Sequence, residues 1–192
     1  MIDRATRTGE LFCNDGSVIN EADILKNSTD YSGARIVMNE LHAFIHRGIV
    51  FDLSAKIIIP SETTVYLTGQ TNGKTVHFHK ENYTSNAGGI EFKLLEGVTA
   101  TGGSAMTPIN RNRASTTQST LIVKSGATVT QTGTELYLIG FPESATPSRA
   151  SSLSGGETLE WVLKPQTFYA IQINNFSNAE RTVYAELCWY EV

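Results

Sequence analysis

The chain of 192 residues has few cysteines, few prolines and few charges. Its two cysteines, Cys13 and Cys188, lie near opposite ends, so they make no disulfide framework and fit no metal-ligand spacing. We expect both to be thiols in a reducing compartment. Charged residues make up 18% of the chain, below the roughly 25% of an average globular protein. The net charge of −4 does not suit a protein that covers phosphates, so we expect no nucleic-acid partner.

Long apolar runs are also missing. No stretch approaches the roughly 20 apolar residues of a membrane-spanning helix, and the longest runs, such as Ile57–Ile59, have the length of a strand. The polar start, Met1–Arg4, has no apolar segment of the kind found in secretory signals. We therefore expect no membrane partner, and we interpret the glycosylation triplets at Asn27, Asn82 and Asn175 as chance.

The chain is rich instead in hydroxyl and β-branched residues. Ser, Thr and Asn supply 51 residues, Val, Ile and Thr supply 49, and there are 16 glycines but only 5 prolines. This composition favours strands joined by turns. The apolar fraction of 40% is too high for a disordered chain, and a domain of this length can build one core without disulfides.

Residues 1–39 are predicted to form an extended N-terminal arm. The segment is polar and has few large apolar residues, so it has little core of its own. Fully extended, about 35 residues reach about 100 Å at roughly 3.3 Å per residue, enough to cross onto a neighbouring subunit. Its short apolar clusters supply the expected anchors on a partner, namely Leu11, Phe12 and Ile24.

From residue 49 onward, strand-like runs alternate with turn signals every 8–12 residues. Near the end, for example, Val183, Ala185, Leu187 and Trp189 share one face. The pattern predicts an all-β protein, an antiparallel jelly-roll-like β-sandwich over residues 40–192. The expected strands are 48–53, 63–68, 75–80, 90–95, 120–124, 135–141, 158–163, 167–173 and 181–190. Residues 35–48 fit a helical stripe ending at Gly48 as well as strands.

Two connections break this rhythm. Residues 96–119 and 142–157 are long and rich in Gly, Ser, Thr and Ala. Loops longer than about 12–15 residues are uncommon in compact domains unless they have a function or are disordered. If these are ordered, their backbone groups need partners, and neighbouring copies of the protein are one source.

Motifs for catalysis and for ligands are weak. Gly69–Thr75 is one residue short of a phosphate-binding loop, and its Asn72-Gly73 step indicates a hairpin. The pairs His42 with His46 and His77 with His79 could contribute to a metal site, but exposed histidines on a half-buried strand are the ordinary alternative. No recognised catalytic string occurs, and the carboxylates are scattered. We expect no enzyme activity, no metal and no cofactor.

The most distinctive short string is predicted to bind backbone or protein. It consists of Asn110, Arg111, Asn112 and Arg113, within the long 96–119 connection. Arginine offers a rigid fork of donors, and asparagine both donates and accepts. These side chains either fix their own loop or contact a neighbouring subunit, and the sequence leaves both open.

Several strings occur in a characteristic order: Ile45–Gly48 with Phe51, Phe92–Arg113, Glu160–Pro165, Tyr169–Asn175 and Cys188–Glu191. Their joint order resembles small β-rich virion structural proteins of tailed bacteriophages, over residues 42–191. The resemblance implies a non-enzymatic β-sandwich that decorates or cements the capsid. It implies binding to the major capsid protein and to itself, with a trimer as the first expectation and a dimer open. The expected location is the capsid surface, after assembly in the host cytoplasm.

Two alternatives remain. A tail- or fibre-associated module that binds host glycan would need exposed aromatic side chains, with Tyr31, Tyr66 and Tyr83 as candidates. A small glycan hydrolase would need two carboxylates that face each other across a cleft.

Overall fold

The computed structural model describes residues 11–12, 18–19, 40–143, 151–154 and 160–192. The chain divides into two compact units, Met1–Ala43 and Phe44–Val192. In the first unit, strand β1 (Leu11–Phe12) pairs with β2 (Val18–Ile19) in an antiparallel hairpin. The predicted anchors Leu11 and Phe12 therefore lie in β1, whereas Ile24 is outside the described residues.

The segment whose pattern fitted both helix and strand forms a helix, α2 (Glu40–His46). The chain leaves the helix at Gly48, whose positive φ of 70° is a conformation that glycine adopts without strain. Its backbone N–H donates to the carbonyl of Ile45, and the N–H of Ile49 donates to that of Phe44. These are the bonds of a glycine C-cap. No helix among the described residues is long and apolar enough to span a membrane.

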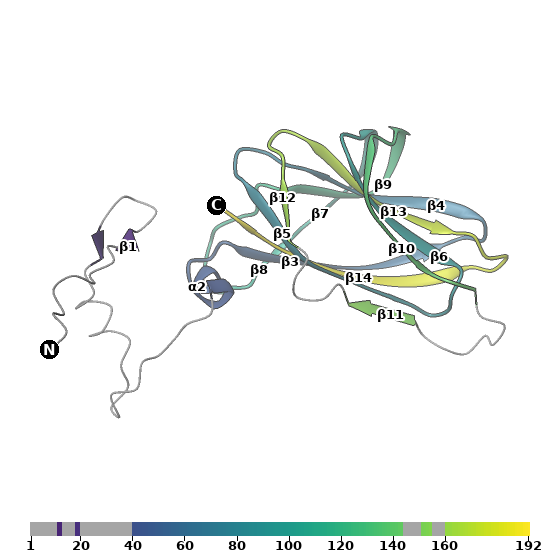
Figure 1. Cartoon of the computed structure of the whole chain (residues 1–192), viewed down its shortest axis with the longest axis horizontal. Coiled ribbons are helices and arrows are strands. Elements are labelled where there is room, and N and C mark those ends of the chain that lie inside the picture. The colour runs from purple at the N-terminus through teal and green to yellow at the C-terminus, as the bar shows by residue number, and fades with distance from the viewer. Residues whose placement is uncertain (1–10, 13–17, 20–39, 144–150, 155–159) are drawn as a thin grey trace, which may run out of the picture. The chain divides into compact units, whose positions relative to one another are not determined.

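All the other described strands belong to two antiparallel sheets, which form the layers of a sandwich (Figure 1). The first sheet has the order β10-β6-β13-β4-β9-β7. Its strands are β4 (Thr63–Gln70), β6 (Ile90–Glu96), β7 (Thr99–Met106), β9 (Ile122–Gln131), β10 (Thr134–Phe141) and β13 (Phe168–Asn175).

The second sheet has the order β11-β5-β14-β3-β8, and a further strand, β12, also pairs with β5. Its strands are β3 (Val50–Ile59), β5 (Val76–Ser85), β8 (Ile109–Asn110), β11 (Ser151–Ser154), β12 (Trp161–Leu163) and β14 (Arg181–Glu191). The prediction of an all-β sandwich is confirmed. The chain alternates between the sheets from β3 through β6 and again from β12 through β14.

The core lies between the sheets. Inward positions of β14 are buried as the alternation predicts, among them Val183, Ala185 and Leu187. A register shift in the pairing of β14 with β5 falls between Cys188 and Trp189, and both of these side chains are buried. Such a bulge explains why strict alternation fails at this point.

The connection expected over residues 96–119 is not a single long loop, because it contains β7 and β8. β7 covers the outer edge of β9, which itself pairs with β4, and β8 covers an edge of β3. Exposed residues dominate β7. β7 could not be predicted from the sequence, because its small and hydroxyl residues lack the apolar alternation that is typical of a half-buried strand.

The ribbon formed by β7 and β9 bends at glycines. Gly102, Gly103 and Gly126 all have positive φ, and Gly102 pairs with Ala127 across the ribbon. Beyond the bend, Ala100 and Val129 pack with a second, smaller apolar cluster that contains Leu95, Val98 and Ala170 and is flanked by Tyr66. Glycine at the bend thus allows one ribbon both to extend the sheet and to reach this second cluster.

Candidate functional site

The predicted string Asn110–Arg113 begins at the end of β8, where Asn110 pairs with Phe51 of β3. The Asn110 side chain is buried. Its Nδ2 donates to the carbonyls of Gly48, at 2.8 Å, and Thr117, at 3.1 Å. Its Oδ1 accepts the backbone N–H of Asn112 at 2.9 Å. One asparagine therefore joins the exit of α2 to both sides of the loop that follows β8.

Asn112 and Arg113 also hold this part of the chain. Nδ2 of Asn112 donates to the carbonyl of His46 at 3.0 Å, and its Oδ1 accepts the N–H of Ala114 at 3.1 Å. Nη1 of Arg113 lies 3.5 Å from the Asn110 carbonyl. Three of the four residues thus satisfy backbone groups of their own loop and of the neighbouring helix end.

Arg111 points elsewhere. Its Nε donates to Oδ2 of Asp52 on β3 at 2.5 Å, and this bond is the main reason that the pKa of Arg111 is raised. Arg111 also lines a polar depression of about 240 Å³. The other lining residues come from β3 and β14, namely Asp52, Leu53, Ser54, Glu186, Leu187 and Cys188.

Strand register places the polar members of this depression side by side. Asp52 is paired with Cys188, and Ser54 with Glu186. On the other side of β14, Asn82 is paired with Glu186, and its Nδ2 lies 3.5 Å from Oε2 of that residue. Oδ1 of Asn82 is buried and has no hydrogen-bond partner among the described residues.

Of the residues that line the depression, Asp52 and Glu186 are acidic and Arg111 is the single cation. The carboxylate of Asp52 is engaged by that arginine, whereas Glu186 is exposed. The arrangement suits a ligand group that donates hydrogen bonds and carries a positive charge, such as an ammonium or guanidinium.

A second polar cluster lies at the β5–β14 pairing and includes one of the predicted histidines. Nδ1 of His77 is 2.5 Å from Oε1 of Glu160, which also accepts the Tyr190 hydroxyl at 2.6 Å. The rings of His77 and Tyr190 stack with centroids 4.5 Å apart. The hydrogen bond from Tyr190, followed by that with His77, holds the pKa of Glu160 below its ordinary value.

Sequence reasoning missed this carboxylate partner, because 83 positions separate Glu160 from His77. The other predicted pair, His42 and His46, lies on α2 with both side chains exposed. Among the residues that the structure describes, no three His, Cys, Asp or Glu side chains gather into a group able to hold a metal ion.

Other carboxylates join separate segments of the chain by hydrogen bonds. Glu191 is buried and accepts hydrogen bonds from Ser119 Oγ at 2.6 Å, Thr120 Oγ1 at 2.7 Å and Trp189 Nε1 at 3.1 Å, besides backbone N–H groups. Burial alone would raise the pKa of Glu191, but the bonds from Ser119 and Thr120 outweigh burial and lower it. The C-terminal strand is thereby tied to the segment before β9.

Glu96 has a similar role at the start of β13. It accepts Nζ of Lys164 at 2.6 Å and the hydroxyl of Tyr169 at 2.9 Å. The bond from Lys164 is the main reason that the pKa of Glu96 is lowered, and burial raises the pKa of Tyr169 to about 12. Glu96 and Glu191 are thus both used to hold parts of the fold together.

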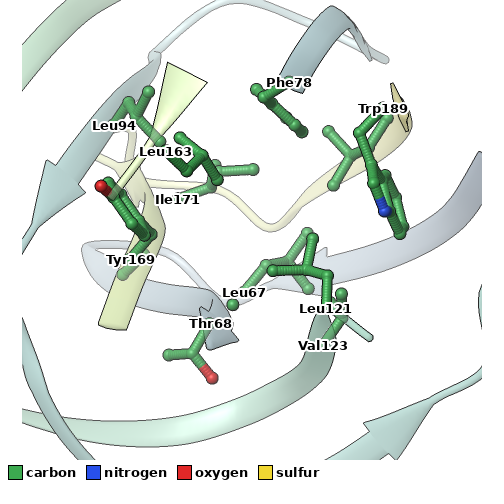
Figure 2. Close-up of a pocket in the computed structure, with 13 residues that line it drawn as sticks. Leu67, Thr68, Phe78, Leu94, Leu121, Val123, Leu163, Tyr169, Ile171 and Trp189 are labelled. Atoms are coloured by element: carbon green, nitrogen blue, oxygen red, sulfur yellow. The ribbon is translucent and has the colours of Figure 1, made fainter. Parts of the chain in front are cut away.

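Between the sheets lies an apolar cavity, drawn in Figure 2, into which Leu67, Leu121 and Val123 project. Its volume is about 40 Å³. Ligand pockets usually measure roughly 300–1,000 Å³, so this cavity is a packing void and offers no room for an organic ligand.

The aromatic residues expected to stack on sugar are placed differently from the prediction. Tyr83 is buried and stacks on Phe92 with ring centroids 4.1 Å apart, so it is wrong as an exposed platform. Tyr66 is half-buried against the second apolar cluster. Tyr31 is outside the described residues. The exposed aromatic beside the depression is instead Tyr184, on the same strand as Glu186.

No protein-family model and no curated protein matches this chain. Its function is therefore inferred from its own residues.

Proposed function

We propose that the protein is a structural component of a tailed-phage virion, a capsid decoration or cement protein. In this role it binds the major capsid protein and further copies of itself on the capsid surface and transforms no substrate. Assembly takes place in the host cytoplasm. The observation that carries the proposal is the order of the strands.

Four strands of each sheet have a distinctive order. One sheet contains β12-β5-β14-β3 and the other β4-β13-β6-β10. If β7 to β9 and the four-residue β11 are set aside, this order supports an eight-stranded jelly roll made of two Greek keys. Jelly rolls occur in viral capsid proteins and in lectins. Because a fold alone does not determine function, the surface must supply the rest of the argument.

The loops support a binding role. The side chains of Asn110, Asn112, Glu191 and Asn175 are used to hold loop backbone, and Asn175 alone donates to the carbonyls of Ile59, Pro60 and Ala179. A loop that is already ordered loses little conformational entropy when a partner binds. Such loops can dock repeatedly onto equivalent sites of a shell, where several weak contacts combine into high avidity.

The depression beside Arg111 supplies a chemical basis for one contact. We assign it a basic side chain of the major capsid protein as its occupant, which would lie beside Glu186. The lysine or arginine would add the positive charge that the depression lacks.

The experiment is to locate and then reconstitute the contact. Electron cryo-microscopy of virions from the phage that encodes the chain should show density for it on the head. Empty heads that lack the protein should co-sediment with the recombinant chain, and Glu186→Gln should weaken this binding, whereas Glu180→Gln, another exposed carboxylate, should not. Density at the tail, or no co-sedimentation, would disprove the capsid assignment.

The same depression favours a second candidate, a glycan-binding module. Asp52, Arg111 and Glu186 are planar polar groups of the kind that bind sugar hydroxyls. Tyr184 is 50% exposed and lies two residues from Glu186 on the same strand face. A glycan array would identify the sugar that the protein binds best. Titrating this sugar into the wild type and into Tyr184→Ala then distinguishes a glycan-binding module from a capsid protein. Specific sugar binding that Tyr184→Ala abolishes would favour this candidate.

A further inference from the structure

Strand β10 lies at one edge of the first sheet. Among the described residues its only strand neighbour is β6. An edge strand leaves a row of backbone N–H and C=O groups without ladder partners, and natural proteins usually protect such a row. Short strands, charges, bends and bulges are the common means of protection.

The other outer strands carry these protections. β8 has two residues, β12 three and β11 four, so each offers little backbone to a partner. β7 has eight residues, but its middle is bent at Gly102 and Gly103, both of which have positive φ. A partner strand could not follow such a bent edge over its whole length.

β10 is different because its edge is long and apolar. It has eight residues, Thr134–Phe141, and Glu135 is its only charged residue. A register shift between Glu135 and Tyr137 interrupts the strand near its start, and the stretch from Tyr137 to Phe141 pairs regularly with β6. Within that stretch, Leu138 is 49% exposed.

The charged side chains around β10 pair with one another. Lys93, which is paired with Leu138, lies 3.0 Å from a carboxylate oxygen of Glu135 and 3.5 Å from one of Glu91. Two copies of β10 running antiparallel and centred on Leu138 would set Glu135 opposite Phe141 of the other copy. No like charges would meet along the strands, and the two Leu138 side chains would lie together on the outer face.

The inner face agrees with the same register. Phe141 belongs to the core, and Tyr137 and Ile139 are partly buried and pack against it. A pairing centred on Leu138 places Tyr137 of one copy beside Ile139 of the other, so inward residues stay inward on both sides. We infer that β10 is a self-association edge, through which two copies of this chain join their six-stranded sheets into one continuous sheet about a two-fold axis.

This inference is independent of the capsid, since it concerns two copies of the purified chain. It predicts a dimer as the building unit, whereas the sequence led us to expect a trimer first.

Disulfide trapping tests the register directly. Paired residues on antiparallel strands have Cα atoms about 4.5–5.5 Å apart, within the range of a disulfide. In a Cys13→Ser background, with the buried Cys188 retained, the Leu138→Cys variant should form a covalent dimer under mild oxidation. The Val162→Cys variant is the control: that residue is 61% exposed on the short strand β12 and should remain uncrosslinked.

A charge substitution tests the energetics. Leu138→Lys sets two like charges opposite each other, so the dissociation constant measured by analytical ultracentrifugation should rise at least about tenfold, while Val162→Lys should leave it unchanged. Thermal unfolding of both variants shows that the fold is intact. A wild-type chain that stays monomeric up to millimolar concentration, or a Leu138→Cys variant that crosslinks no better than Val162→Cys, would overturn the inference whatever the outcome of the capsid experiment.

Discussion

At the scale of single residues, several polar side chains stabilise the backbone at points far apart in sequence. Glu191 is the clearest example, since all of its bonds to the segment Ser119–Leu121 cross 70 to 72 positions. Glu191→Gln replaces one acceptor oxygen by an amide that faces donors. We expect the free energy of unfolding, measured in urea, to fall by about 3 kcal/mol. Glu180→Gln, at an exposed carboxylate, is the control and should change it by less than about 0.5 kcal/mol.

The pH dependence of stability follows from the same group. The pKa of Glu191 is lowered in the folded protein from its ordinary value of 4.5, so the folded state binds the proton less tightly than the unfolded state does. The stability that the Glu191 carboxylate contributes is fully present at pH values above the pKa that this group has in the unfolded chain. It is lost as the pH falls through the lower pKa that the group has in the folded protein. Wild-type stability should therefore decline below about pH 4.5, as Glu96 and Glu160 also predict, and more steeply than that of Glu191→Gln. Parallel pH profiles would refute this role.

The string at Asn110–Arg113 yields a graded prediction. Asn110 is buried and bonds to three backbone groups, so Asn110→Ala should lower the free energy of unfolding by about 2–3 kcal/mol. Arg113 is exposed and makes one long contact, so Arg113→Ala should cost less than about 0.5 kcal/mol. Limited proteolysis should show the same ranking, with the loop cleaved faster in Asn110→Ala than in Arg113→Ala. Equal losses in the two variants would contradict the division between the asparagine and the arginine.

The double variant Arg111→Ala with Arg113→Ala tests whether the arginines act between molecules. Because Asn110 and Asn112 fix the loop without them, we expect the loop to stay ordered. Loss of Arg111 leaves Asp52 without its cation, so binding to empty heads through a basic capsid side chain should be at least as strong as in the wild type. Co-sedimentation measures the binding, and limited proteolysis measures the loop. A disordered loop with unchanged binding would show that the arginines serve only their own chain.

At the scale of the elements, the bend in the β7–β9 ribbon depends on glycine. A Cβ at Gly103 would lie 3.1 Å from both Ala127 Cβ and the Ser125 carbonyl, whereas a Cβ at Gly126 would meet nothing within 4 Å. Both positions have positive φ, so each alanine carries about 1 kcal/mol of backbone strain. Gly103→Ala should lower the free energy of unfolding by at least about 1 kcal/mol more than Gly126→Ala. Urea unfolding of the Gly103→Ala and Gly126→Ala variants measures this difference.

Strands with alternating apolar residues could be predicted from the sequence, and elements with another pattern could not. The strand at Arg181–Glu191 matches its predicted range closely because it is half-buried along its length. β3 was predicted to end at 53 but continues to Ile59, and β7 was missed, because exposed positions and small residues weaken the pattern there. In the candidate site, Arg111 was predicted. Asp52, Asn82 and Glu186 were not, because only strand register brings them together.

At the scale of the whole molecule, the described strand pairings separate the N-terminal segment from the sandwich. β1 pairs with β2 alone, and the strands from β3 to β14 pair among themselves. We expect a chain without residues 1–35 to stay soluble and to unfold within a few degrees of the wild-type melting temperature, as measured by differential scanning calorimetry. A truncated chain that precipitates or loses cooperative unfolding would mean that the sandwich depends on this segment.

The same truncation tests the predicted arm as a capsid anchor. An extended segment that binds a second subunit adds its affinity to that of the sandwich, so its loss reduces avidity far more than any single contact does. We expect the truncated protein not to co-sediment with empty heads. Replacing Leu11, Phe12 and Ile24 together by serine in the full-length chain should give the same loss, since these residues are the expected apolar anchors. If both variants bind heads as the wild type does, the capsid contact lies wholly on the sandwich, and the depression beside Arg111 becomes its first candidate.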